Sequence, residues 1–224
     1  HRFHSRFCCR YFLRIMKAKQ NIKNIDSATQ TREVVLELFD LNKSFDDNHV
    51  LNHFNMKLYK GENLVIMGKS GSGKTVMIKC LVGLMEADSG TIRVMNKDIT
   101  NLNQESLDIL RADIGFLFQG SALYDSMTVR ENLEFPLRRH FKKFGKQIDT
   151  EKQVVDALES VGLAHAIDLL PVELSGGMQR RVALARTLIL QPKIILYDEP
   201  TSGLDPITAK EIIILMQDIQ KQYN

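Results

Sequence analysis

The chain has 224 residues, 44% of them hydrophobic and 25% charged, which is the composition of a globular domain with its own core. The formal net charge is +3, but four of the 30 basic residues lie in residues 1–15, where there is no acid, so the remainder carries 26 basic against 27 acidic residues. This balance argues against a nucleic-acid-binding surface, and the sequence has no apolar run of the roughly 20 residues that a membrane-spanning helix needs.

Residues 1–32 are expected to be a disordered or non-native leader. The Arg-rich start runs up to Met16, which we interpret as the natural first residue; the alternative is a basic amphipathic anchor, because arginines four apart align on one helix face. Cys8 and Cys9 lie in this leader and Cys80 in a predicted helix. These positions form neither a disulfide framework nor a zinc-binding spacing, as expected for a reducing cytoplasm.

Residues 33–224 are predicted to form one α/β domain. Two strands joined by a polar turn indicate an antiparallel β layer, and the later alternation of strands and helices predicts a mostly parallel core sheet. A polar helical stretch from about 121 to 174 is interpreted as an inserted helical subdomain. The expected strands are 33–41, 50–59, 63–67 (buried), 89–95, 113–118 and 193–197 (fully buried), and the expected helices are 74–85, 105–111, 154–161, 178–190 and 207–220.

A glycine-rich loop lies between the predicted strand 63–67 and the predicted helix 74–85. It matches the phosphate-binding pattern G-x-x-x-x-G-K-[ST], in which backbone amides and a helix N-terminus face phosphate oxygens. Lys74 is expected to pair with the β and γ phosphates of ATP, and Thr75 to offer its hydroxyl to Mg²⁺. The residues of the loop are Gly68, Lys69, Ser70, Gly71, Ser72, Gly73, Lys74 and Thr75.

Two acids, Asp198 and Glu199, follow the apolar strand 193–197. Carboxylates at the carboxyl end of such a strand lie where ligands bind in open α/β sheets. Asp198 is expected to hold Mg²⁺ directly or through water, and Glu199 to polarise a water for attack on the γ-phosphate. Taken alone, an acidic pair here is also typical of a helix N-cap.

A second anion site is predicted where Leu174, Ser175, Gly176 and Gly177 open a helix. Ser175 is the expected N-cap, and the two glycines expose backbone amides. An ordinary helix start is the alternative interpretation.

The order of these motifs, ending in Ser202, Gly203, Leu204 and Asp205, resembles the ABC-type ATPases from residue 33 to 224. The resemblance implies a P-loop NTPase fold, an ATP hydrolase with ATP and Mg²⁺, and a homodimer that sandwiches two ATPs head to tail. In such a dimer the 175–177 segment contacts the partner's ATP, and Asp205 lies in a loop crossing the interface.

The resemblance also assigns roles to two other residues. Gln119 matches the glutamine that reaches Mg²⁺ or the attacking water and senses the membrane subunit, and Phe45 matches the aromatic that stacks on adenine. For Phe45, a core aromatic is the alternative. Met178 departs from the commonest signature, which has glutamine at this position.

The cargo is less specified. The run 120–138 after Gln119 resembles the ATPases of bacterial Mla-type phospholipid-trafficking transporters and their plastid relatives, which implies lipid transport; import of an amino acid or another small molecule is the alternative. An apolar surface around Leu123, Tyr124 and Phe135 is expected to accept a permease helix or to pack within the lobe. The basic run 138–146 is interpreted as a solvated face, with contact to anionic lipid heads as the alternative.

The implied protein is peripheral on the cytoplasmic face of the inner membrane, bound to an integral permease and not to nucleic acid. Chromosome and ribosome types of ABC ATPase are disfavoured, because the chain has neither long heptad repeats nor a second copy of the domain. Family members carry a switch histidine roughly 30 residues beyond Glu199, and none of the six histidines follows that residue. The sequence is therefore expected to be a fragment, poorly soluble and nearly inactive by itself.

Overall fold

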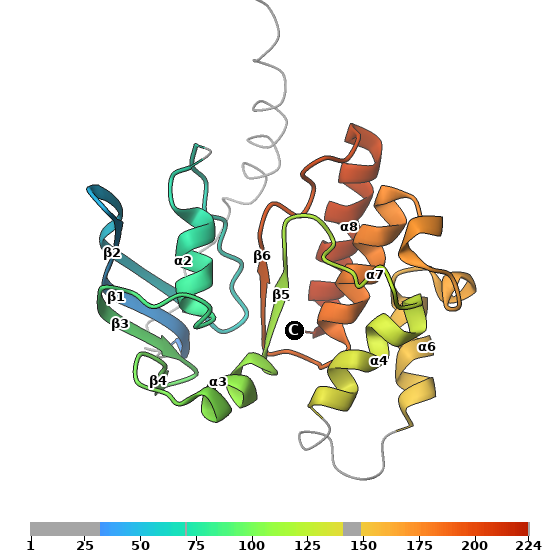
Figure 1. Cartoon of the computed structure of the whole chain (residues 1–224), viewed down its shortest axis with the longest axis horizontal. Helices are drawn as coiled ribbons and strands as arrows, with labels where there is room; N and C mark the ends of the chain where they lie inside the picture. Colours follow the sequence, from blue (N-terminus) through green and yellow to red (C-terminus); the bar gives the residue numbers. More distant parts are fainter. Residues whose placement is uncertain (1–31, 70, 141–148, 224) are drawn as a thin grey trace, which may run out of the picture. The chain divides into compact units, whose positions relative to one another are not determined.

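A four-stranded antiparallel sheet carries the first half of the domain in the computed structural model, which describes residues 32–69, 71–140 and 149–223 (Figure 1). Strands β1 (Val34–Phe45) and β2 (Asn48–Tyr59) pair through the predicted turn, with Phe45 opposite Asn48. Strand β3 (Ser89–Val94) covers the other edge of β1, and β4 (Lys97–Asp98) pairs with β3. The sheet order β2-β1-β3-β4 confirms the expected antiparallel layer.

The parallel part of the fold consists, in the described residues, of two strands. Strand β5 (Ile114–Leu117) follows helix α3 (Gln104–Arg111) and pairs in parallel with β6 (Ile194–Tyr197). The pairing continues past the last strand residue, because the Asp198 amide donates to the Leu117 carbonyl at 3.0 Å. The ends of both strands are thereby fixed side by side.

The prediction of a buried strand at 63–67 is wrong for this structure. Residues 64–67 are apolar but 37–75% exposed, and no strand pairs with this segment within the described part of the chain. Strand 193–197 was expected to be fully buried, yet only Ile194 of β6 is buried and the other three strand residues are half-buried. An apolar run becomes a strand only where a neighbour satisfies its backbone groups. In the described residues β6 pairs with β5 alone, and segment 63–67 pairs with no strand.

Helices flank both sheets. Helix α2 (Lys74–Leu81) follows the glycine-rich loop, and helices α7 (Gly176–Leu188) and α8 (Pro206–Tyr223) lie beside β5 and β6 (Figure 1). Helices α4 (Val129–Arg139) and α6 (Thr150–Ser160) pack on α7 together with the short helices η1 (Ala164–Ala166) and η2 (Pro171–Glu173). A capping box between Thr128 and Glu131 starts α4. The limits of the expected helical subdomain stay a prediction.

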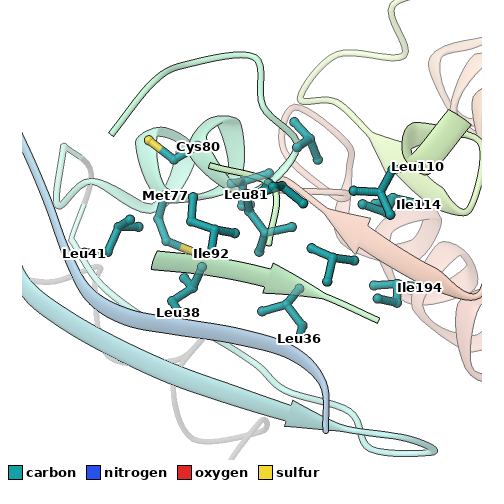
Figure 2. Close-up of a cluster of buried hydrophobic side chains, with 14 of the residues drawn as sticks. Leu36, Leu38, Leu41, Met77, Cys80, Leu81, Ile92, Leu110, Ile114 and Ile194 are labelled. Atoms are coloured by element: carbon teal, nitrogen blue, oxygen red, sulfur yellow. The ribbon is translucent and has the colours of Figure 1, made fainter. Parts of the chain in front are cut away.

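Two main apolar clusters hold these elements. In the first, shown in Figure 2, side chains of β1, α2 and β3 converge, and Leu110, Ile114 and Ile194 extend the cluster to α3, β5 and β6. The second joins α4 and α6 to the buried face of α7. In the described residues, no helix is long and apolar enough to cross a membrane.

Candidate functional site

The glycine-rich loop leads directly into α2, as its sequence requires. Gly73 caps the helix at φ 87°, a left-handed conformation that glycine adopts without strain. A side chain there would also meet the Val50 side chain at 2.8 Å, so the position is closed to other residues. The Lys74 ammonium folds back over the loop and donates to the Gly68 and Lys69 carbonyls, both at 3.0 Å. Ser70 lies outside the described residues.

The first residue pair of the site joins this loop to the end of β6. The Thr75 hydroxyl donates to the Asp198 carboxylate, at 3.0 Å from Oδ2 and 3.3 Å from Oδ1, although the two residues are 123 positions apart. Asp198 is only 5% exposed. The preceding Tyr197 is half-buried, and burial raises its pKa to about 12. The hydroxyl and the carboxylate expected to hold a cation therefore lie together.

The second pair joins the end of β5 to the residue after Asp198. The Gln119 side-chain amide donates to Glu199 Oε2 at 3.0 Å and lies 3.5 Å from the Ser202 hydroxyl. Glu199 has φ 45°, a left-handed conformation uncommon for a residue with a side chain, and its carbonyl accepts from the Ser202 amide. Such backbone outliers cluster at functional sites, and this one directs an exposed carboxylate towards Gln119.

The start of α7 has the geometry of a helix N-terminus open to solvent. The Ser175 hydroxyl accepts from the Met178 amide at 3.2 Å, which makes Ser175 the N-cap, and Ser175 and Gly176 are exposed. Gly177 lies against α8, where an added Cβ would be 2.7 Å from the Thr208 methyl group. The segment is therefore exposed to solvent at Ser175 and Gly176 and closely packed at Gly177.

Asp205 and Phe45 make contacts other than those of the two pairs. Asp205 caps α8, since its carboxylate accepts from the Ile207 and Thr208 amides at 3.0 and 3.1 Å. Hydrogen bonds from the Thr208 side chain and backbone hold the pKa of Asp205 below its ordinary value. Phe45 is 43% exposed at the end of β1, which argues against a core role, and the Lys43 ammonium lies 5.6 Å from the ring centre.

Magnesium would find hard oxygen ligands at this site. Mg²⁺ prefers one or two protein oxygens completed by phosphate oxygens and waters. The Thr75 hydroxyl and the Asp198 carboxylate offer such a pair, with the Gln119 amide oxygen nearby on the β5 loop. In the described ranges no group of three or more His, Cys, Asp or Glu could hold a metal. The Thr75 hydroxyl and the Asp198 carboxylate fit the two-ligand pattern of a Mg²⁺ that binds together with a nucleotide.

Sequence reasoning missed three side chains that hold the loops around the site. Arg180 is 4% exposed and binds carbonyls of two separate loops. Asn132 is fully buried and makes five hydrogen bonds, one of them with Arg186. A polar residue beside Val129 and Leu133 on an apolar helix face is a signal for Asn132. No comparable signal separates Arg180 from its neighbour Arg181.

Other expectations fall on residues that the structure leaves undescribed. The leader and most of the basic run 138–146 are among them. Tyr124 and Phe135, in contrast, are described: their rings lie 5.1 Å apart, and Tyr124 is 44% exposed. Phe135 is half-buried, and Leu123 packs against the cluster of α4, α6 and α7, so the role of this surface stays a prediction.

The sequence is similar to a protein family model and to several curated proteins. A family model described as "ABC transporter" matches residues 51–202. A methionine import ATP-binding protein of Clostridium tetani is 42% identical over 188 residues, covering 84% of this chain and 58% of the relative. The chloroplastic protein trigalactosyldiacylglycerol 3 of Arabidopsis thaliana is 40% identical over 195 residues, covering 84% and 55%.

A probable ribonucleotide transport ATP-binding protein of Mycobacterium leprae is 40% identical over 189 residues, covering 84% of this chain and 54% of the relative. The chain spans little more than half the length of these relatives. A dimeric ATP-binding cassette, MJ0796, solved in a post-hydrolysis state with ADP and Pi, superimposes with a TM-score of 0.75 at 33% identity, covering 84% of this chain and 83% of that one. The chain belongs to the ABC transporter family and carries its ATP-binding domain.

Proposed function

We propose that the chain binds Mg-ATP and hydrolyses it to drive an ABC transporter. The observation that carries the proposal is the pairing of Thr75 with Asp198 and of Gln119 with Glu199, which places the phosphate-binding loop beside two carboxylates and an amide. Family membership supports the same activity.

The chemistry follows from the positions of these groups. The loop amides and Lys74 bind the β and γ phosphates, and Thr75 and Asp198 hold Mg²⁺, which neutralises phosphate charge when bound. Glu199 accepts a proton from the attacking water, and Gln119, already within hydrogen-bond distance of Glu199, orients that water. The exposed Ser175 and Gly176 then contact the ATP of a second copy, in a homodimer like that described for MJ0796.

The partners and place of action follow from this role. An integral permease supplies the pathway for the cargo, and the chain acts on the cytoplasmic side of the membrane that holds it. Tyr124 and Phe135 provide an aromatic contact suited to a permease segment. Phe45 would stack on adenine with its exposed face.

For the cargo we propose a small polar molecule of the amino-acid class. Four of the five first relatives are methionine import ATP-binding proteins, at 38–42% identity. Phospholipid, the first expectation from the sequence, is not supported by these matches, and the alternative expectation, an amino-acid importer, fits them better. Relatives with other printed roles occur at similar identity, so the cargo needs a direct test.

Two variants test the hydrolysis. Glu199→Gln should retain Mg-ATP affinity and lower turnover by about 10²- to 10⁴-fold, because an amide holds a water but cannot accept its proton. Lys74→Ala should weaken nucleotide binding by about ten- to a hundredfold, since contacts to charged groups contribute about 1.5–3 kcal/mol. Calorimetry and phosphate release measure both. Parental turnover in Glu199→Gln, or parental affinity in Lys74→Ala, would contradict these assignments.

A transport assay tests the cargo. Uptake of labelled methionine and exchange of labelled phospholipid are compared in cells with and without the gene, with Glu199→Gln as the inactive control. Loss of methionine uptake alone supports the proposal. Unchanged methionine uptake with altered phospholipid exchange would restore the lipid expectation.

A further inference from the structure

Arg180 is a buried arginine one turn into α7, just after Gly176 and Gly177, which we call the signature glycines. Its side chain is enclosed, with 4% of the residue exposed. Its guanidinium donates from Nη1 to the Phe118 carbonyl at 3.1 Å and from Nη2 to the Ser202 carbonyl at 3.2 Å. These carbonyls are 62 residues before it and 22 residues after it, so one side chain bonds two loops that are far apart in the sequence.

The two carbonyls flank the pair assigned to hydrolysis. Phe118 immediately precedes Gln119, and Ser202 closes the turn that begins at Glu199. The same two loops meet through the contacts of Gln119 with Glu199 and Ser202. The contacts therefore form a closed ring, in which Arg180 sets the backbone separation across which the Gln119 and Glu199 side chains must reach.

Stability alone does not account for a charge at this position. No carboxylate in the described part of the chain forms an ion pair with Arg180, and its Nε has no hydrogen-bond partner there. Removal from water lowers the pKa of the guanidinium. A buried charge without a counter-ion carries a desolvation cost that an apolar side chain would avoid. What arginine offers in return is a planar fork that reaches two carbonyls at a fixed spacing, which lysine cannot reproduce.

We propose that Arg180 is a positioning residue, which holds the Gln119 loop and the Glu199–Ser202 turn at the separation that hydrolysis requires. The inference rests on the proposed ATP hydrolysis and adds a residue to it. Because Arg180 extends from α7 one turn after Ser175, it also ties this pair to the start of the signature helix. Arg180 itself touches neither nucleotide nor water in this role.

Kinetics of three variants test the role. Arg180→Gln should lower kcat by about ten- to a hundredfold, the effect of misplacing reacting groups by about 1 Å, with KM for ATP changed by less than about threefold. Arg180→Lys should regain part of the loss. The matched control is Arg181→Gln: Arg181 is the next residue of α7 and bonds Glu211 and Val161 instead, so kcat should stay within about twofold. Parental kcat in both Arg180 variants would overturn the proposal.

A second readout needs no turnover. The sequence has no tryptophan, so Phe118→Trp introduces a single tryptophan, excited selectively at the red edge of its absorption, beside the carbonyl that Arg180 binds. In that background Arg180→Gln should increase acrylamide quenching, because the loop is released, and Arg181→Gln should not. If the parent protein, assayed in full length, hydrolyses no ATP, the proposed function fails, and the quenching measurement alone tests the role of Arg180. Equal quenching in the Phe118→Trp parent and its Arg180→Gln derivative would then overturn the positioning role.

Discussion

The two signature glycines should respond differently to the same substitution. An added Cβ at Gly177 would be 2.7 Å from the Thr208 methyl group, whereas at Gly176 its nearest neighbour is Leu204 at 3.8 Å. Thr208 cannot easily give way, because it is β-branched and its hydroxyl bonds Asp205. Gly177→Ala should therefore destabilise the domain, and Gly176→Ala should not.

The magnitude follows from two opposing effects. Overpacking by one methyl group costs about 1–3 kcal/mol, and replacing a helical glycine with alanine gains about 0.5–1 kcal/mol. Gly177→Ala should thus lower the free energy of unfolding by about 1–2 kcal/mol. For a domain of this size the melting temperature falls by about 2–8 °C. Gly176→Ala should keep the stabilisation that alanine gives in a helix, because the added methyl group causes no clash at this position.

Thr208→Ser isolates the methyl contact, because it removes the clashing carbon and keeps the hydroxyl. Urea unfolding of Gly177→Ala, Thr208→Ser and the double variant forms a thermodynamic cycle. The coupling energy should be about 1–2 kcal/mol in favour of the double variant. Gly177→Ala as stable as Gly176→Ala, or a coupling near zero, would refute the argument that α7 and α8 meet at this glycine.

Two other changes test contacts that hold the loops. Asn132→Ala should lower the free energy of unfolding by about 1–3 kcal/mol in urea unfolding, because it removes the side-chain partner of the Tyr124 amide and of the Met127 carbonyl; a loss below about 0.5 kcal/mol would contradict this. The pKa of Asp205 is lowered in the folded state, so its contribution is present above the unfolded value and is lost as pH falls through the folded one. Asp205→Asn should therefore lose less stability than the parent protein between pH 6 and pH 3 in thermal unfolding, and equal losses would argue against the capping contact.

Local hydrogen bonding explains why much of the site could be predicted. The glycine-rich loop, the Ser175 cap and the β1–β2 turn depend on residues within a few positions of one another. The loop depends on glycine's freedom at positive φ, the helix start on a side-chain cap, and the β1–β2 turn on Asp46 at φ 50°, a conformation that aspartate tolerates; all three are visible in the sequence. The helices at 74–85, 105–111 and 178–190 were predicted from the same local rules.

Contacts between distant residues were decided only by the tertiary structure. An apolar run at 63–67 reads as a strand, but a strand needs a neighbour, and the described residues provide none. Arg180 and Arg181 are indistinguishable in sequence, yet one is buried against carbonyls 62 and 22 residues away and the other bonds an exposed glutamate. Periodicity in the sequence predicts which face of a helix a side chain occupies. It does not predict which distant segment packs against that face. The contacts of Arg180 and Gln119 with the Glu199–Ser202 turn are therefore seen only in the tertiary structure.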